Sequence, residues 1–465
     1  MTLSIQHLIG ILATLFVVLV LGFYSGRKVK TSNDFSVTDK KAGNILVAGT
    51  IMGTLIGGSS TVGTAQLAFL YGLSAWWFTL GGGIACFFLG LILVKPLRRE
   101  NFETVPRFLK SAYGEQAAVA AALFLSIAIF LNIIPQIMSS TALLVSMFPL
   151  AANLAPLITV LLMASYVLFG GVWGTGYIGI MKVILTCLSV LIGGGLALNM
   201  MGGISGIYSS FPSYPWFSLF GRGVNTDLAA GFSLVLGVLS SQIYFQAIFS
   251  ARDEKSARQG ALISAVLSPV IGLMGIVIGL FMRFNHPDIE AALALPLFIL
   301  RYLNPWFAGV MQATLLLAAI GTGAGLALGV STMLSRDIYQ KLHPEAGDCR
   351  VLMIFRSFIL ITLFLALVTL SIFGGNGLIL QWSFLSLSLR GTTIFFPLIA
   401  ALFIKGRVDA RAGTIAVIAG PLSVFFSSLF LSWEINPLYL GMSVSFLIIF
   451  IGFLKLWQAA YSKSA

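Results

Sequence analysis

Long apolar stretches, separated by short clusters of charged residues, recur from one end of this chain to the other. A helix needs about 20 mostly apolar residues to cross the hydrocarbon core of a bilayer. Strands of a membrane barrel would instead alternate every second residue over about ten positions, and no such alternation is seen. The pattern predicts an all-α polytopic membrane protein with about 13 transmembrane helices, at residues 4–24, 43–71, 74–95, 115–147, 154–172, 178–200, 228–249, 260–282, 305–334, 351–373, 377–403, 411–432 and 437–457.

Composition supports this prediction. Of 465 residues, 58% are hydrophobic and only 9% are charged, whereas a soluble domain carries roughly 25% charged residues. A surface this poor in charge must face lipid, so the lipid bilayer is an expected partner.

The net charge of +12 reports membrane topology rather than a nucleic-acid partner. With the N-terminus outside, the basic residues gather in the inner loops, and the outer loops hold only Arg222, Arg283 and Arg301. The first span has no basic residues before it, so we expect a retained helix rather than a cleaved signal. We therefore predict a multi-pass protein of a bacterial-type inner (cytoplasmic) membrane, with the C-terminus cytoplasmic.

Few residue types that perform chemistry are available. The three cysteines and three histidines have no metal-binding or disulfide spacing, and no phosphate-binding loop or nucleophile elbow is present. These absences argue against an enzyme and against an organic cofactor. All fifteen Asp and Glu residues fall in loops or near helix ends. A cation at membrane depth would therefore be held by hydroxyls and by backbone carbonyls of broken helices.

Three polar clusters interrupt the predicted spans, at residues 53–61, at 318–325 and at Ser240-Ser241-Gln242. Glycines weaken a water-exposed helix by roughly 1 kcal/mol each, so the two glycine-rich segments could unwind and expose carbonyls. Alternatively, small residues could let helices pack closely, and the serines could bond to the preceding turn. The residues alone leave both interpretations open.

Several loose motifs follow one another along most of the chain: Gly22-x-Tyr24-Ser25, Ser32-x-Asp34-Phe35, Gly63-x8-Gly72, Phe245-Gln246, Ala251-Arg252-Asp253 and the stretch from Ala318 to Ser335-Arg336-Asp337-Ile338-Tyr339. In the order of these motifs the chain resembles the sodium:solute symporter family, which includes proline, pantothenate and sodium–glucose transporters.

The resemblance implies a leucine-transporter-like fold with two inverted five-helix repeats in a single domain, 1–465. Repeat one would span 43–200 and repeat two 228–403, with helix 1 at 4–24 and helices 12–13 at 411–457 outside the repeats. The second and seventh helices would be broken near mid-membrane. The implied function is a symporter that couples sodium entry to uptake of a small organic solute by alternating access.

In such a fold the sodium ion would be held by the carbonyls of Gly53 and Ile56, by the carbonyl of Ala318 or Ala319, and by the hydroxyl of Thr322. The chain departs from the family pattern in two places. Only Thr322 supplies a hydroxyl where the family usually has two, and Gly179 and Lys182 stand where many members carry an Asp and a Gln.

Candidate solute-binding residues face a common cavity in the implied architecture. They are Ser59, Ser60, Thr61, Trp76, Asn132, Gln136, Ser241, Gln242, Trp382 and Arg390, with Trp77 beside them. For the tryptophans the alternative is an interfacial belt, and for Asn132 and Gln136 it is support of the backbone kinked at Pro135.

Arg390 is the only charge placed near the middle of a span, and it favours a solute with a carboxylate, either anionic or zwitterionic. It could instead hydrogen-bond helix-end carbonyls or pair with a loop acid such as Asp288. Two other functions remain open: a facilitator or exchanger without ion coupling, and the membrane sensory component of a signalling system. Only about eight residues follow the last predicted helix, which argues against a fused kinase.

Overall fold

The structure is a computed structural model, and it describes residues 3–26, 42–100, 104–151, 153–170, 177–343, 345, 347–373, 377–430 and 435–464. Within these ranges the chain forms helices joined by turns, together with one isolated backbone bridge between Ala42 and Ala251. The predicted all-α architecture is confirmed. The motif Ser32-x-Asp34-Phe35 and the basic residues around it lie outside the described residues.

The first half of the chain contains helices that often change pitch within one apolar segment. These elements are α1 (Ile5–Gly26), α3 (Asn44–Leu55), the π-helix η1 (Ser59–Gly63), α4 (Thr64–Tyr71), the 3-10 helix η2 (Gly72–Trp76), α5 (Trp77–Phe88), the π-helix η3 (Leu89–Leu93), α6 (Val94–Glu100), α7 (Val105–Tyr113), α8 (Glu115–Leu131), α9 (Ile134–Met147), α10 (Leu154–Gly170) and α11 (Tyr177–Met200).

The second half begins with two short helices and continues with longer ones. They are α12 (Gly203–Ser210), α13 (Ser213–Trp216), α14 (Val224–Val238), α15 (Gln242–Ser250), α16 (Glu254–Asn285), η5 (Ala291–Leu293), α17 (Ala294–Tyr302), α18 (Pro305–Thr332), the π-helix η6 (Met333–Tyr339), α19 (Gln340–Leu342), α20 (Asp348–Phe373), α21 (Ile379–Phe403), α22 (Ala410–Phe430) and α23 (Pro437–Ser464).

Each of the thirteen predicted segments contains helix. By length and apolarity, nine helices among the described residues could cross a membrane, or ten if α14 and α15 count as one bent span. Several other predicted spans correspond to shorter apolar helices, such as Asn44–Leu55 and Leu154–Leu168. Membrane-crossing helices are therefore confirmed, and the count of thirteen stays a prediction.

The second predicted span is broken in its middle. Helix α3 ends at Leu55, and Ile56 adopts extended dihedral angles (φ −96°, ψ 103°) before the helix resumes. Two amides released by the break find side-chain acceptors: Gly57 N donates to Ser60 Oγ at 2.9 Å, and Gly58 N donates to Gln136 Oε1 at 3.0 Å. Because these acceptors replace the lost helical bonds, the glycine-rich segment can unwind inside the bundle.

The seventh predicted span is broken in a similar way. Helix α14 ends at Val238, α15 begins at Gln242, and their axes differ by 46°. Ser241 has extended dihedral angles at the start of α15, and its hydroxyl donates to the Gly237 carbonyl at 2.6 Å. The structure thus contains both breaks that the resemblance implies.

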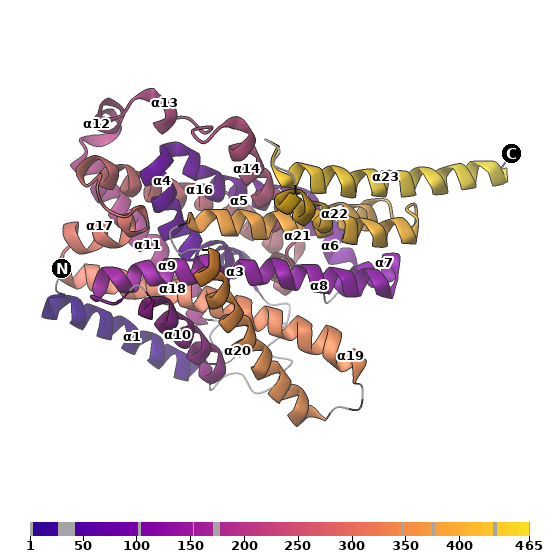
Figure 1. Ribbon diagram of the computed structural model, residues 1–465, viewed down its shortest axis with the longest axis horizontal. Coiled ribbons are helices and arrows are strands. Elements are labelled where there is room, and N and C mark those ends of the chain that lie inside the picture. The colour runs from indigo at the N-terminus through magenta and orange to yellow at the C-terminus, as the bar shows by residue number, and fades with distance from the viewer. Residues whose placement is uncertain are drawn as a thin grey trace.

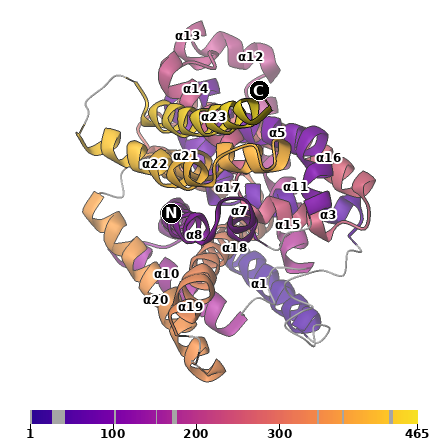
Figure 2. The ribbon, with the colours of Figure 1, turned by 90° about the vertical axis from the view of Figure 1, so that its right-hand side faces the viewer.

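The two broken helices lie inside the bundle, and other helices surround them. Helix α16 packs against α3, α4 and α5, while α14 packs along α21 and α18 packs along α9. Helix α1 lies against α18 at one side, and α22 and α23 run side by side at another (Figures 1 and 2). The described ends of the chain lie far apart along the long axis (Figure 1).

At one end of the bundle, the broken helices are joined through their backbones. Ala42 N donates to the Ser250 carbonyl, and Arg252 N donates to the Ala42 carbonyl, both at 3.0 Å. The guanidinium of Arg98 donates to the carbonyls of Ile248 and Ala251 at 3.0 and 2.9 Å. This Ala42–Ala251 bridge fastens the start of α3 to the end of α15.

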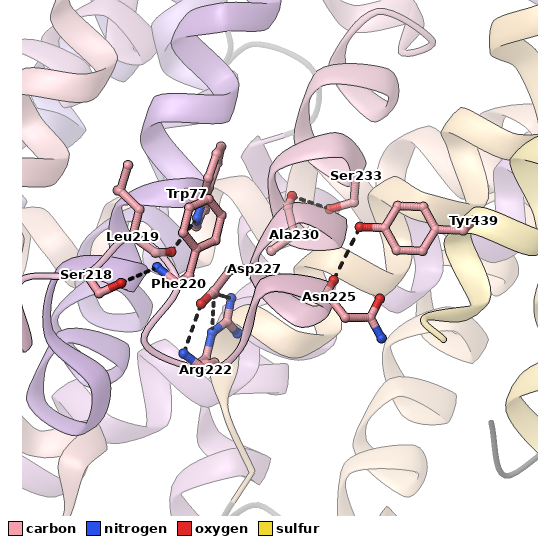
Figure 3. Close-up of polar contacts among 10 residues, drawn as sticks. All are labelled: Trp77, Ser218, Leu219, Phe220, Arg222, Asn225, Asp227, Ala230, Ser233 and Tyr439. Atoms are coloured by element: carbon pink, nitrogen blue, oxygen red, sulfur yellow. Dashed lines mark hydrogen bonds and ion pairs between the residues drawn. The ribbon is translucent and has the colours of Figure 1, made fainter. Parts of the chain in front are cut away.

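The turn that precedes α14 is held by a buried ion pair (Figure 3). Asp227, in the first turn of α14, accepts from the backbone N of Arg222 at 2.9 Å and from its Nε at 2.7 Å. The Trp77 indole N–H donates to the nearby Leu219 carbonyl at 2.7 Å. Asp227 is thus hydrogen-bonded to Arg222 at the start of a helix, which agrees with the prediction that the acidic residues lie in loops or near helix ends.

Candidate functional site

A polar cluster forms where the first broken helix resumes. The Gln136 Nε2 of α9 donates to Ser59 Oγ at 3.0 Å, and the Ser383 hydroxyl of α21 donates to the same oxygen at 2.8 Å. All three side chains are at most 4% exposed. The cluster therefore joins η1, α9 and α21 by hydrogen bonds in the interior of the bundle.

A second polar cluster forms at the other break. Arg390 of α21 donates from Nη1 to Ser241 Oγ at 3.3 Å and from Nη2 to Ser386 Oγ at 3.1 Å. The side chain is only 4% exposed, and its Nε is buried without a hydrogen-bond partner among the described residues. A guanidinium carries five N–H groups, so this one retains unused donors.

Both clusters lie on one face of α21. Ser383, Ser386 and Arg390 follow the spacing i, i+3, i+7 that brings side chains to the same side of a helix. Seven residues of helix rise about 10 Å, which is the scale of a small organic molecule. One face of α21 therefore connects the two broken helices with hydroxyls at one end and a guanidinium at the other.

The oxygens predicted to hold sodium on α18 have a different partner. Lys182 Nζ, from α11, donates to Thr322 Oγ1 at 2.9 Å and to the Ala318 carbonyl at 3.2 Å. The Thr322 hydroxyl itself donates to the Ala318 carbonyl at 2.8 Å. A protein cation thus contacts two of the predicted sodium ligands.

The other predicted sodium ligands lie close by. Gly53 is near the end of α3, and a Cβ added to it would lie 3.3 Å from Val183 Cγ2, next to Lys182. A Cβ added to Gly57 would lie 3.0 Å from Thr322 Oγ1. The predicted ligands on α3 and α18 are therefore brought to the same region. Ile56 is buried at the break, and Ala319 contacts the position of Gly58.

The remaining candidate solute residues are placed less centrally. Ser60 and Thr61 are buried in η1, where each hydroxyl donates to the Gly57 carbonyl. Trp76 donates its indole N–H to the Pro269 carbonyl of α16 at 3.0 Å. The rest are partly buried: Asn132 in the turn between α8 and α9, Gln242 at the start of α15, and Trp382 beside Phe373.

Three residues of these clusters, Ser383, Ser386 and Lys182, are not among the predicted site residues. Ser383 and Ser386 were not singled out, although their helical spacing to Arg390 was readable. Lys182 was noted as a departure from the family pattern but was not assigned a contact. The suggested ion pair of Arg390 with Asp288 is not formed, since Arg390 bonds to serines while Asp288 is exposed in a turn.

The model of the sodium:solute symporter family matches residues 35–420. This chain belongs to that family. Family membership confirms that the protein is a transporter. The relatives and the similar structures also support sodium-coupled symport of a small solute.

Several relatives of known sequence are similar over most of the chain. The human high affinity choline transporter 1 is 24% identical over 92% of this chain and 77% of its own length. The bovine sodium/myo-inositol cotransporter 2 is 22% identical over 85% of this chain and 65% of its own length. An uncharacterized symporter of Bacillus subtilis, YhjB, is 25% identical over 55% of this chain and 53% of its own length.

Solved structures show the same fold. A substrate-bound, outward-open structure of a Na+-coupled sialic acid symporter superposes with a TM-score of 0.76 at 16% identity, over 97% of this chain and 98% of that one. The transporter MhsT in complex with L-phenylalanine gives a TM-score of 0.57 at 16% identity, over 90% and 99% of the two chains. The predicted leucine-transporter-like fold is confirmed, and the exact limits of the two repeats stay predictions.

Proposed function

We propose that this symporter carries a small solute with a carboxylate group, anionic or zwitterionic, and that Arg390 binds the carboxylate. The observation that supports the proposal is the buried guanidinium near the middle of α21: among the described residues it donates hydrogen bonds to two neutral serine hydroxyls, and its Nε has no partner there. The symporter would work by alternating access, with the solute between the two broken helices.

An unneutralised arginine is unfavourable in this position. Insertion scales assign about 2.5 to 3.5 kcal/mol to an arginine at the centre of a membrane helix. Serine hydroxyls offset only part of this free energy because they carry no charge. A carboxylate would supply the missing charge and would match the planar, bidentate geometry of the guanidinium.

The same arginine argues against a cationic solute. Choline, named in the human relative, carries a fixed positive charge, and a buried guanidinium would repel it. We infer that the solute of this protein differs from choline. The hydroxyls of Ser59, Ser60 and Ser383 and the Gln136 amide would bind its remaining polar groups from the other end of the α21 face.

The finer assignments of the sequence analysis belong to the same proposal. Sodium would be coordinated by Gly53 and Ile56, at the end of α3, and by Ala318, Ala319 and Thr322 of α18. The protein would lie in a bacterial-type inner membrane with its N-terminus outside. The absence of a catalytic role and of an organic cofactor is part of the proposal as well.

A matched ligand screen tests the carboxylate. Purified protein in detergent is heated with pairs of compounds, each an organic acid or amino acid and the amide or methyl ester that lacks its carboxylate charge. A ligand raises the stability by RT ln(1 + [L]/Kd), so we expect the compounds with a carboxylate to raise the Tm and the amides and esters to have no effect. The Arg390→Gln variant should lose the response to acids. Stabilisation by amides equal to that by acids would contradict the proposal.

A further inference from the structure

The ammonium group of Lys182 lies among the oxygens proposed to coordinate sodium. It contacts Thr322 Oγ1 and the Ala318 carbonyl at 2.9 and 3.2 Å, which are ordinary hydrogen-bond distances. These two atoms belong to α18, whereas Lys182 belongs to α11, so the lysine reaches across from a separate helix.

The surroundings of Lys182 are those of a cation site built from neutral oxygens. Helices α3, α11 and α18 carry no Asp or Glu over their described lengths. The backbone of the first break lies close to this contact, because Thr322 Oγ1 lies 3.0 Å from a Cβ position at Gly57. The positive charge of Lys182 is therefore met by a carbonyl and a hydroxyl, the same types of ligand that a hard cation uses.

A lysine ammonium and a sodium ion cannot share these ligands. Both are monovalent cations of the same sign, and at ligand-sharing distances in a low dielectric their repulsion is strong. The Lys182 ammonium also occupies one of the two lone pairs of the Thr322 hydroxyl, whose proton is donated to the Ala318 carbonyl.

We propose that Lys182 is a tethered competitor of sodium: its ammonium fills the ion site, and sodium binds there only after the lysine side chain has withdrawn. The inference rests on the sodium ligands of the proposed function, and it adds a residue that regulates their occupancy. Four flexible methylene groups allow such withdrawal without unfolding α11.

The position of Lys182 between the repeats gives the competition a consequence for transport. Lys182 lies in predicted repeat one and Thr322 in predicted repeat two, so rocking of one repeat against the other changes the distance between them. Lysine would refill the site as sodium leaves, and the site would be cationic in both halves of the cycle. A tethered cation thus lowers the apparent sodium affinity in the state seen here.

Ion titration of the purified protein, without solute, tests this competition. The Tm is followed against NaCl at constant ionic strength, with KCl as the balancing salt, for the natural protein and for Lys182→Gln. The sodium midpoint is the apparent sodium Kd fitted to the rise RT ln(1 + [L]/Kd). If lysine leaves the site free in at most one molecule in ten, the apparent sodium Kd is raised about tenfold or more. We therefore expect Lys182→Gln to shift the sodium midpoint at least tenfold lower.

Three further variants separate competition from a general effect of the substitution. Lys182→Arg keeps a tethered cation and should show no tenfold gain. Lys405→Gln removes a lysine from an exposed ion pair with Glu100 and should leave the midpoint unchanged. The double variant Lys182→Gln with Thr322→Ala should lose the gain, since it lacks a proposed ligand. If Lys182→Gln does not fold, Lys182→Met replaces it.

The outcomes also distinguish this proposal from the carboxylate proposal. A sodium midpoint in Lys182→Gln that is equal to or higher than in the natural protein overturns the competition and leaves sodium coupling intact. No sodium response in either protein overturns the competition together with the proposed sodium ligands. Neither result concerns Arg390, because no solute is present in the titration.

Discussion

Gln136 bonds to Ser59 and to the backbone just before it. Its Nε2 donates to Ser59 Oγ and its Oε1 accepts from Gly58 N, both at 3.0 Å. One amide side chain from α9 therefore accepts a backbone hydrogen bond that the first broken helix lacks, and it also holds the Ser59 hydroxyl. This relationship connects stability and the proposed solute binding in a single residue.

Replacing this amide should destabilise the protein. In Gln136→Leu the buried Gly58 N–H loses its acceptor, which costs about 1 to 3 kcal/mol. We expect a lower Tm in detergent than for the natural protein. Asn132→Ala is the control, since Asn132 lies one turn away beside the same proline. An equal loss of Tm in both variants would indicate that stability depends on the backbone kink at Pro135 and not on the two hydrogen bonds of the Gln136 amide.

Arg390 should determine solute affinity. Arg390→Lys keeps the charge but loses the bidentate fork, and Arg390→Gln loses both. Hydrogen bonds to charged groups contribute about 1.5 to 3 kcal/mol, so Lys should weaken solute affinity about tenfold and Gln should nearly abolish binding. Uptake into proteoliposomes at equal protein levels measures both. The exposed Arg301→Gln serves as a control for loss of a charge. Equal solute affinity in Arg390→Gln would return Arg390 to a structural role.

Thr322 provides the single hydroxyl of the proposed sodium site. Thr322→Ala should raise the sodium concentration required for half-maximal uptake, because one ligand is lost. Thr322→Ser should be close to neutral, since the hydroxyl survives. The measurement is sodium-dependent uptake at fixed solute concentration. A sodium dependence that does not change in the Ala variant, with normal membrane insertion, would place the ion elsewhere.

Two glycines of the first broken helix should differ in their tolerance of a methyl group. A Cβ at Gly58 would lie 2.4 Å from Ser139 Cβ, whereas a Cβ at Gly53 would meet only Val183 Cγ2 at 3.3 Å. Overpacking costs about 1 to 3 kcal/mol, so Gly58→Ala should lower the Tm clearly more than Gly53→Ala.

Side-chain size at Gly53 tests the proposed carbonyl ligand. Gly53→Leu should crowd α11 beside Lys182 and should impair sodium-dependent uptake, while Gly53→Ala should largely retain it. Unchanged sodium dependence in the Leu variant would mean that the carbonyl of Gly53 is not a ligand. Protein yield and the elution volume in gel filtration provide the control for folding.

The sequence predicted what depends on local composition. The glycines from 53 to 58 and the serines at 240–241 pointed to the positions of both helix breaks, but composition left close packing of small residues open as well. The breaks themselves were predicted from the family resemblance. Contacts between helices were harder to predict. The bonds of Lys182 to Thr322 and of Gln136 to Ser59 join residues 140 and 77 positions apart, and they depend on how whole helices are placed and rotated. Ser383 was missed for a different reason: a lone serine in an apolar helix looks like any small packing residue until its neighbour is known.

The Ala42–Ala251 bridge provides a way to measure the separation of the two broken helices by hydrogen–deuterium exchange. Its two backbone amides, at Ala42 and Arg252, exchange with solvent deuterium only when the ends of α3 and α15 separate. Their hydrogen–deuterium exchange rate therefore reports how often the two helix ends separate, and the measurement requires no label attached to the protein. A ligand that keeps the ends together lowers this exchange rate, and one that separates them raises it.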